Sequence, residues 1–439
     1  MISSIALGIF LISIYLGKWL FGRIFNHLSL YVFVWFVIVF LYDLNLIRYN
    51  SVSSFTWLVI LFAYVSFVLG ILTSYTAFQF NPQNSDSFNS DLYFDSIWFR
   101  NDGKILVKII IILGIIGILV ALQNWYILLE KFGSIQAVLL NASLVYKMRI
   151  QRTIEGQIPY LFTLSYVAVF FAAVYSAYKN KITIVTIIPF IGVILKEMSQ
   201  SARAGILNAV LLYSSTFLLF KFFIVDKKKI RLSNKSLVLG SFLLVTLVII
   251  SATFVKVTRV TNEKIKGASS QLNKLEENTF ISPSIYLYFS GHIGTLEKVL
   301  KSEEKSNLLA EKTLTMFYST VAKFGLTKRP KDHDKGYFIP VWINTGTYLR
   351  EIYSDFGLVG IFIVPFLLGL FTTYFWFRFM DTGKLLYLVI LSHLYIIIGF
   401  SFVIFAVRLA TWVFPIILTP IFIVMVERFY RKKNPTTNN

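Results

Sequence analysis

The 439-residue chain is 56% apolar and only 15% charged, and it contains no cysteine. Soluble domains carry about 25% charged residues, so a soluble globular fold is excluded, and without cysteine so are disulfides, thiol catalysis and thiolate metal sites. The net charge of +20 does not indicate nucleic-acid binding, because the sequence has no soluble basic domain, and its four separated histidines do not form a zinc-like cluster.

Long apolar runs follow one another along most of the chain, and many reach the roughly 20 residues that cross the hydrocarbon layer of a bilayer. They predict an all-α polytopic membrane protein with about eleven transmembrane helices, in a range of about 10–12. The predicted helices cover residues 2–21, 30–47, 55–78, 105–123, 158–178, 182–196, 204–225, 236–255, 356–378, 385–405 and 409–426. The first run lacks a basic start and a small-residue cleavage site, so we expect a retained helix rather than a signal peptide.

Basic residues between the predicted helices orient the chain. The densest short cluster lies at 227–235, between the seventh and eighth helices, and Lys and Arg accumulate in cytoplasmic loops. Alternation from this cluster places the N-terminus outside and the C-terminus in the cytoplasm. The chain then divides into transmembrane helices one to eight over 1–255, an external helical loop over 256–344, helices nine to eleven over 345–430, and a cytoplasmic polar tail over 431–439.

The external loop at 256–344 is unusually long for a structureless connection. Apolar residues recur in it at helical spacing, over 284–300 and again over 302–324. Prolines punctuate the loop at several points. We therefore expect a large external loop that is mostly helical and forms a small cap over the outer membrane face.

Four arginines lie close to helix ends on the predicted outer side: Arg149, Arg152, Arg203 and Arg408. The guanidinium group presents a planar fork of donors that matches phosphate oxygens in pairs, and it stays charged at any relevant pH. An arginine at the edge of the hydrocarbon is costly unless it is paired or lines a wet cavity. These residues are candidates for binding phosphate groups; interfacial snorkelling or a structural ion pair is the alternative for each.

Arg203 lies in a very short polar turn, 196–205, between two apolar runs. Most of the residues around it are small, which allows a helix or a ligand to approach the backbone closely. Arg203 also precedes a predicted helix, whose free N–H groups and dipole favour an anion. The turn therefore predicts a phosphate site. In the alternative, Glu197 neutralises Arg203 and the turn is purely structural.

A second polar cluster leads into the ninth predicted helix and contains Tyr348, Arg350, Glu351 and Asp355. It brings an aromatic ring, a cation and two carboxylates to the outer mouth of that helix. A carboxylate partly withdrawn from water has a raised proton affinity, so Glu351 and Asp355 are candidate general bases. The alternative is helix capping, together with a surface ion pair between Arg350 and one of the two carboxylates.

Two histidines of the external loop, His292 and His333, are further catalytic candidates, because a histidine side chain titrates near neutral pH. His292 follows the segment Tyr-Leu-Tyr-Phe-Ser-Gly at 286–291. A solvated histidine without a catalytic role is the alternative for each.

The order of these features along the chain is familiar. Ser-Ala-Arg-Ala-Gly at 201–205 opens one helix, and a segment from Tyr348 through Asp355-Phe-Gly-Leu-Val-Gly360 opens another after the large loop. With 286–291, this order resembles bacterial O-antigen and capsule repeat-unit polymerases of the Wzy type, over most of helices six to nine and the loop. The related O-antigen ligases usually show a His-Asn pair where this chain has Thr345-Gly346, which favours a polymerase.

The resemblance implies a glycosyltransferase of the GT-C type in the bacterial cell membrane, independent of metal and without a cofactor. It would transfer a growing glycan from undecaprenyl pyrophosphate to the non-reducing end of a new lipid-linked unit, on the outer face of the membrane. The implied partners are undecaprenyl-pyrophosphate-linked oligosaccharide, membrane lipid and a chain-length regulator. An O-antigen ligase and a lipid-linked oligosaccharide flippase or transporter remain as alternatives.

Under this resemblance the candidate residues take three kinds of role. The residues expected to bind pyrophosphate are Arg203, Arg408, Arg149 and Arg152. Those expected to take part in catalysis are Glu351, Asp355 and His292. Those expected to contact sugar are Tyr348 and Tyr288.

Overall fold

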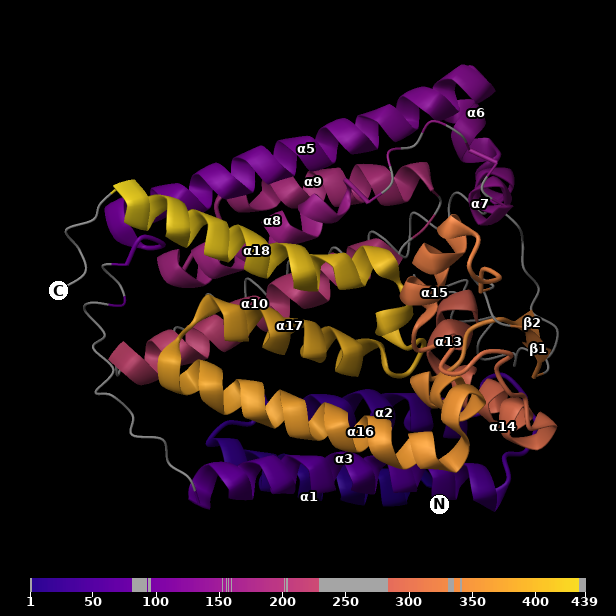
Figure 1. The fold of residues 1–439 in the computed structure, drawn as a ribbon. Coiled ribbons are helices and arrows are strands. Elements are labelled where there is room, and N and C mark those ends of the chain that lie inside the picture. The colour runs from indigo at the N-terminus through magenta and orange to yellow at the C-terminus, as the bar shows by residue number, and fades with distance from the viewer. Residues whose placement is uncertain are drawn as a thin grey trace. The chain divides into compact units, whose positions relative to one another are not determined.

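A computed structural model of the chain describes residues 2–80, 93, 96–200 except 152, 155, 157 and 159, 202, 204–228, 283–330, 335–339 and 342–433. The helices up to residue 228 are α1 (Ile2–Phe21), α2 (His27–Asp43), α3 (Ser54–Phe80), α5 (Arg100–Phe132), α6 (Ile135–Leu140), α7 (Ala142–Gln151), α8 (Thr163–Lys179), α9 (Ile184–Ser199) and α10 (Ala204–Lys228). The elements that follow are α13 (Pro283–Ser290), α14 (His292–Ser302), α15 (Thr315–Val321), the 3-10 helix η1 (Ala322–Phe324), strands β1 (Tyr337–Phe338) and β2 (Trp342–Ile343), α16 (Tyr348–Thr382), α17 (Leu385–Phe400), the 3-10 helix η2 (Ala406–Arg408) and α18 (Ala410–Lys433) (Figure 1).

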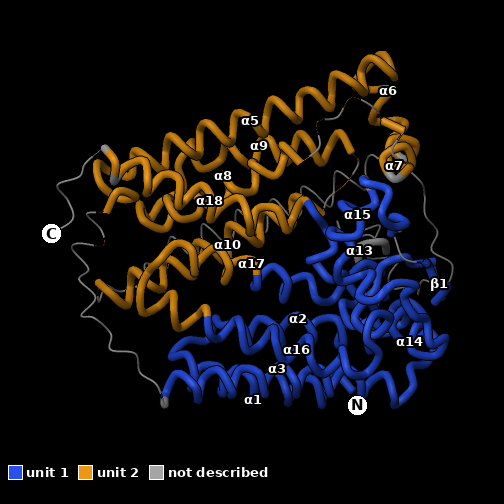
Figure 2. Tube along the Cα trace, in the orientation of Figure 1, with its two compact units in different colours: residues 1–83, 261–374, 394–410 blue, residues 84–260, 375–393, 411–439 orange. Residues whose placement is uncertain are grey.

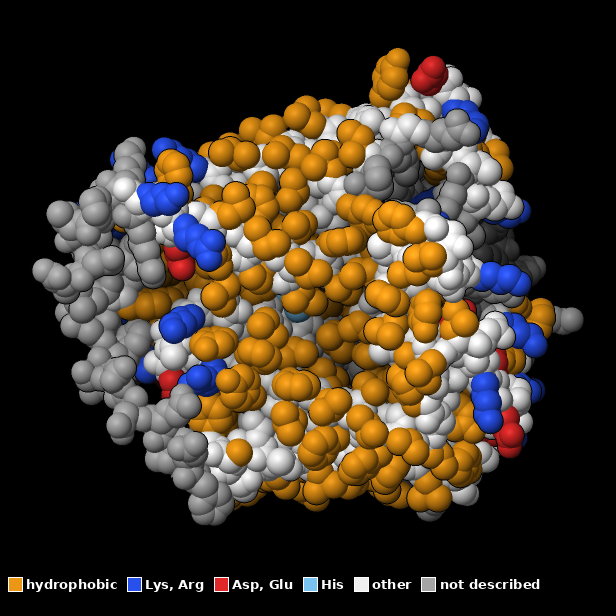
Figure 3. Space-filling model, in the orientation of Figure 1, with side chains coloured by type: hydrophobic (Ala, Val, Ile, Leu, Met, Phe, Trp, Pro, Cys, Tyr) orange, Lys and Arg blue, Asp and Glu red, His pale blue; other side chains and the backbone are white. Residues whose placement is uncertain are grey.

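The described residues form an all-α protein, apart from the two-residue antiparallel hairpin of β1 and β2. Within this part of the chain, six helices are long and apolar enough to cross a membrane: α1, α3, α5, α10, α16 and α18. Hydrophobic side chains cover the middles of the helices, and Lys and Arg gather toward helix ends (Figure 3). On α1, for example, Ile12, Tyr15 and Trp19 are all strongly exposed. Such apolar outer faces embed a protein in lipid.

Each predicted helix coincides with an observed one, except 236–255, which lies outside the described residues. Among the helix starts, that of α16 differs most from its prediction, because this helix begins at Tyr348 rather than at 356. The polar residues that were expected to precede this helix therefore lie on its first turns.

The chain forms two compact units (Figure 2). Unit 1 comprises residues 1–83, 261–374 and 394–410, and unit 2 comprises 84–260, 375–393 and 411–439. In unit 1, α2 packs against α1, and α13 and α14 lie against α2. In unit 2, α8 is buried over nearly its whole length, and α5, α9 and α10 all contact it. Its side chains are small or aromatic, as suits a helix enclosed by others.

Two glycines set the distance between α3 and α16 in unit 1. A Cβ atom placed on Gly70 would lie 2.0 Å from the carbonyl oxygen of Phe366, and one on Gly369 would lie 2.2 Å from that of Phe67. Neither contact is sterically possible, so glycine at both positions allows the two backbones to touch. Close backbone approach through small residues is how apolar helices pack where no hydrophobic effect drives them together.

A third glycine divides α16. Gly357 has φ 62° and ψ −149°, a backbone conformation outside the helical region that other residues rarely adopt. The first turns of α16, 348–356, are therefore a short helix joined to the apolar remainder through a glycine. This short helix carries the polar residues of the candidate site.

The helices α13 to α15 confirm that part of the segment expected to form the cap is helical. The apolar stretch at 284–300 is helical but is broken at Gly291, where a Cβ atom would lie 2.4 Å from Ile343. The expected helix at 302–324 is wrong over its first half: α14 ends with Glu303 in the left-handed region, and α-helix resumes only at α15. Between them, the backbone N–H groups of Lys312 and Thr313 bond to Asp355 rather than within a helix.

Candidate functional site

The first turns of α16 are tied to several other elements of unit 1. Tyr348 donates its backbone N–H to the carbonyl of Ser401 at 2.9 Å, and its hydroxyl forms a 2.8 Å hydrogen bond with that of Tyr31. The Tyr348 side chain is fully buried, with its ring near Trp35 and Phe405. Tyr348 was expected to stack on sugar; here its ring instead anchors the start of α16 among other aromatic side chains.

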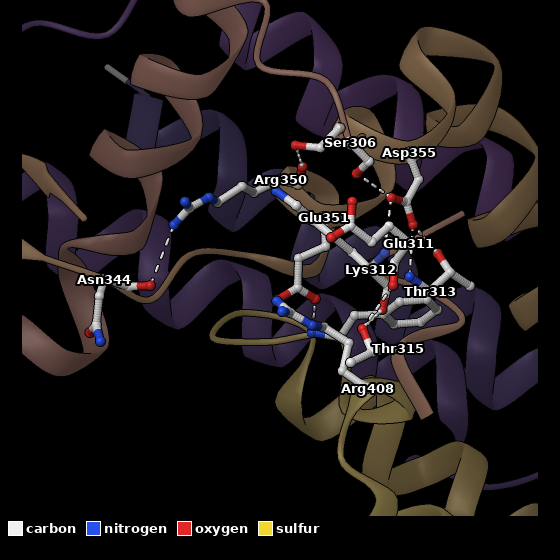
Figure 4. Close-up of polar contacts among 12 residues, drawn as sticks. Ser306, Glu311, Lys312, Thr313, Thr315, Asn344, Arg350, Glu351, Asp355 and Arg408 are labelled. Atoms are coloured by element: carbon white, nitrogen blue, oxygen red, sulfur yellow. Dashed lines mark hydrogen bonds and ion pairs between the residues drawn. The ribbon is translucent and has the colours of Figure 1, made fainter. Parts of the chain in front are cut away.

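Glu351 and Arg408 form a buried ion pair at this point (Figure 4). Arg408 Nη1 lies 2.7 Å from Glu351 Oε1, and the Phe405 backbone N–H donates to Glu351 Oε2 at 2.6 Å. Both side chains are less than 10% exposed. The structure thus pairs Glu351, a predicted general base, with Arg408, a predicted pyrophosphate-binding residue. Hydrogen-bond donors of the protein contact both oxygens of the Glu351 carboxylate. Breaking a buried pair by removing one partner is strongly unfavourable, so the pair fixes η2 against α16.

Arg350 is buried as well, at 1% exposure, but it points away from Glu351 (Figure 4). Its Nη2 donates to the carbonyl of Lys335 at 2.6 Å, its Nη1 to that of Asn344 at 3.4 Å, and its guanidinium lies 5.4 Å from the centre of the Tyr337 ring. Within the described part of the chain, no carboxylate is within ion-pair distance and Nε has no hydrogen-bond partner. The expected surface pair with Glu351 or Asp355 is therefore wrong: Arg350 is a buried cation held by carbonyls and a ring.

Asp355 holds the segment before α15. It accepts hydrogen bonds from the Ser306 hydroxyl, from the backbone N–H groups of Lys312 at 3.1 Å and Thr313 at 2.7 Å, and from the Thr313 hydroxyl at 2.8 Å (Figure 4). These four donors occupy both oxygens of the Asp355 carboxylate. Asp355 therefore acts as a positioning residue that holds the loop against α16.

His292 begins α14 and is 1% exposed. Its Nδ1 lies 3.3 Å from the Thr345 hydroxyl, its ring is edge-on to those of Tyr288 and Phe402, and its Nε2 has no hydrogen-bond partner among the described residues. Burial lowers the pKa of His292 to about 4, so the ring is neutral at neutral pH. If Nδ1–H donates to Thr345, Nε2 is left with a lone pair that can accept a proton. Tyr288 is half-buried beside it.

Glu297, which the sequence did not single out, fastens α14 to the start of α3. Its Oε2 accepts hydrogen bonds from the Thr56 hydroxyl at 2.5 Å and the Ser53 hydroxyl at 2.8 Å, and Lys301 lies 2.7 Å from Oε1. Although burial opposes it, the bonds from Lys301, Thr56 and Ser53 lower the pKa of Glu297 to about 2. Glu297 and Asp355 therefore hold the cap segments of unit 1 at two points.

The polar turn before α10 lies in unit 2 and is described by itself. Glu197 is 4% exposed, accepts the backbone N–H of Gly205 at 2.9 Å, and pairs with Lys196 Nζ at 3.0 Å. Arg149 is near enough to interact with it electrostatically, and also stacks over Tyr146. A carboxylate of the chain thus lies at the start of α10, where the sequence predicted a phosphate. Arg203, like Arg152 and His333, lies outside the described residues.

No protein-family profile, curated protein or solved structure matches this chain. Its chemistry is therefore inferred from its own residues. No group of three His, Asp or Glu side chains that could hold a metal ion occurs in the part of the chain that the structure describes.

The residues at the start of α16 can nevertheless support acid–base and anion chemistry. Arg350 offers a buried positive charge that no carboxylate of the described residues pairs with, and His292 offers a neutral imidazole nitrogen. The loop at 344–347 lies between them: a Cβ atom on Gly346 would touch both the Arg350 side chain and Thr295, and Thr295 bonds to the carbonyl of His292. A cation and a proton acceptor on either side of one loop are typical requirements for departure of an anionic group.

Proposed function

We propose that the chain polymerises lipid-linked oligosaccharide repeat units at the outer face of the bacterial cell membrane. In this proposal it spans the membrane about eleven times, in a GT-C-like arrangement, with its N-terminus outside and its C-terminus in the cytoplasm. The donor is a growing glycan on undecaprenyl pyrophosphate, and the acceptor is a single lipid-linked unit. A chain-length regulator is a proposed partner.

The observation that carries the proposal is the buried guanidinium of Arg350 at the start of an apolar helix, without a carboxylate among the described residues. A charge withdrawn from water is costly unless something neutralises it. Pyrophosphate attached to a membrane lipid is an anion that arrives at this depth, and arginine binds phosphate oxygens in pairs. Arg408, held by Glu351, is a second cation in the same cluster.

The proposed reaction is a glycosyl transfer that needs one base and one stabilised leaving group. The acceptor hydroxyl loses its proton to His292 Nε2, its oxygen forms a bond to the anomeric carbon of the donor glycan, and the bond from that carbon to the pyrophosphate oxygen breaks. Undecaprenyl pyrophosphate leaves with the bonding electrons and is stabilised by arginine. Glu351 orients Arg408, and Asp355 holds the loop; neither has to act as the base.

Deleting the gene in a polysaccharide-producing host and separating the surface glycan on a gel tests this function. Loss of a polymerase leaves a single repeat unit attached, loss of a ligase leaves none on the lipid core, and loss of a flippase blocks all outer glycan. The first pattern is expected, and either of the others would replace the proposal with the corresponding alternative.

Complementation of the deletion then tests the arginines. Arg350→Met and Arg350→Lys should both fail to restore the ladder at normal protein levels, because lysine lacks the planar fork that binds phosphate in pairs. Arg203→Ala should fail as well if the turn at 196–205 takes part. The matched control is Arg48→Met, an exposed arginine on the connection between α2 and α3, which should restore full-length ladders. A full ladder from Arg350→Met would contradict the role of that residue.

A further inference from the structure

A lipid-facing groove lies between α5 and α18 in unit 2. It encloses about 700 Å³ and is lined almost entirely by apolar side chains. Those at its centre are Ile105, Ile109 and Ile112 of α5 with Met425, Val426 and Phe429 of α18. Because both helices are long and apolar enough to cross a membrane, the groove faces the hydrocarbon of the bilayer. Figure 3 shows hydrophobic side chains on these helices and Lys and Arg toward the end where α18 finishes.

One charged residue, Lys108, lines this groove. It is exposed, it lies one turn after Lys104 at the start of the apolar run of α5, and in the described part of the chain no carboxylate is within ion-pair distance of it. A lysine in lipid is costly unless its ammonium reaches the interface or meets an anion. Side chains on a helix lean toward its N-terminus, so the ammonium of Lys108 leans toward the start of α5.

The start of α5 holds further polar groups at the edge of the groove. Arg100 Nη1 donates to the hydroxyl of Tyr430, a groove residue, at 3.1 Å. The carboxylates described nearby are engaged elsewhere: Asp102 pairs with Lys179, and Glu427 accepts the indole N–H of Trp98 at 3.1 Å. Of the two carboxylates Asp102 is neutralised by an ion pair and Glu427 keeps its charge, so the cations Arg100, Lys104 and Lys108 outnumber the unpaired carboxylate among the described residues at this edge.

The dimensions of the groove match one leaflet. Ile105 to Leu113 on α5, and Phe422 to Tyr430 on α18, each cover about 12 Å at 1.5 Å per residue. The hydrocarbon layer is about 30 Å thick, so one leaflet contributes about 15 Å. A molecule that fills the groove therefore has an apolar part of leaflet length, with its polar part at the level of Arg100 and Tyr430.

We propose that this groove binds an anionic phospholipid of the leaflet in which α5 begins and α18 ends. An acyl chain lies along Ile109, Ile112 and Met425, and the phosphate accepts hydrogen bonds from Lys108 and Arg100. Charge complementarity selects the headgroup: a net anionic lipid neutralises the unpaired lysine, whereas a zwitterionic one brings its own cation. The site is separate from the glycan chemistry proposed above and does not depend on it.

Native mass spectrometry of the full-length protein, delipidated in detergent, tests this site. Phosphatidylglycerol and phosphatidylcholine with identical acyl chains are titrated separately. The expected result is a preference for phosphatidylglycerol of about fivefold, the factor that one cation near an anionic headgroup contributes. Lys108→Gln should abolish the preference and Lys108→Arg should keep it. Met425→Trp, which fills the groove without altering charge, should weaken binding of both lipids.

The matched control is Lys131→Gln, an exposed lysine in the last turn of the same helix, which should keep the preference. Equal binding of the two lipids by the unaltered protein would overturn the proposal. So would an unchanged preference in Lys108→Gln, or an equal loss in Lys131→Gln. Displacement of phosphatidylglycerol by an equimolar polyprenyl phosphate would assign the groove to a different lipid.

Discussion

Each unit contains a buried polar cluster near the start of a helix, and the two clusters satisfy their charges differently. At the start of α10, the carboxylate of Glu197 is bonded by Lys196 and by a helix N–H group. At the start of α16, Glu351 is matched by Arg408, whereas the described partners of the buried Arg350 guanidinium are carbonyls and a ring. Among the described residues, the cluster at α10 centres on a carboxylate that cations and a helix N–H group bind, whereas the cluster at α16 holds a buried guanidinium with no carboxylate at ion-pair distance. An excess of buried positive charge is a mark of a site that receives an anion.

Removing the matched carboxylate of the α16 cluster should have the largest effect on stability. Glu351→Ala removes the buried ion pair with Arg408 and the acceptor of the Phe405 N–H, which should lower the free energy of unfolding by about 3–5 kcal/mol. Thermal unfolding of the purified protein in detergent measures this loss. The double variant Glu351→Leu/Arg408→Leu should recover most of it, and a double variant as unstable as the single one would refute the pairing.

Arg350 provides the sharpest contrast with Arg408. In the described part of the chain Arg350→Met breaks no ion pair, so it should lower the melting temperature much less than Arg408→Met, which breaks the buried ion pair with Glu351. Its effect should fall on activity instead: loss of one preorganised donor to a leaving group typically costs about a hundredfold in rate. Incorporation of repeat units by membranes containing each variant, compared with thermal unfolding, separates the two effects. Equal destabilisation by both variants would mean that Arg350 too is a structural residue.

His292 should make the stability of unit 1 depend on pH. Its pKa is lowered from 6.5 to about 4 by burial, so the folded protein favours the neutral ring. The resulting stabilisation is present above pH 6.5 and is lost as pH falls from 6.5 to 4, by about 3 kcal/mol in all. Unfolding of the wild type and of His292→Gln across this interval measures the difference in slope. Parallel curves would show that the ring is not buried in its neutral form.

Substitution in the cluster at the start of α10 should cause the smallest loss of stability. Glu197→Gln keeps an oxygen that can accept the Gly205 N–H but loses the charge that Lys196 matches, so the loss in stability should be about 1–2 kcal/mol. Lys196 reaches solvent in part and can be hydrated once its partner is neutral. Thermal unfolding of this variant beside Glu351→Ala gives the comparison. An equal loss of stability in both variants would show that the two clusters do not differ in this respect.

Helix positions were largely predictable, because bilayer thickness imposes a length on every apolar run; the first predicted helix, 2–21, has the bounds of α1. The ion pair within the site could not be predicted from the sequence. Glu351 and Arg408 are 57 residues apart, and no local pattern relates them. Arg350 is buried because the carbonyls of Lys335 and Asn344 fold back on it, which depends on the path of a loop rather than on periodicity.

The helices of the cap were likewise predictable only in part, because tertiary contacts decide where they end. Apolar spacing indicated a helix from 302 to 324, but Asp355 takes the N–H groups of Lys312 and Thr313, and a tertiary hydrogen bond outweighs local propensity there. The close approach of the Ile343 side chain, which requires glycine at position 291, likewise comes from a residue far along the chain.

Gly357 has a mechanical consequence. Spanning helices tilt to match bilayers of different thickness, and a rigid α16 would turn Arg350 and Glu351 with every such tilt. The left-handed glycine instead separates the segment 348–356 from the apolar rod that follows it, so rotation at one residue absorbs the tilt. The short segment is meanwhile fixed by Tyr31, Ser401 and the Arg408 pair. The orientation of Arg350 and Glu351 is therefore independent of the tilt of the membrane-spanning part of α16.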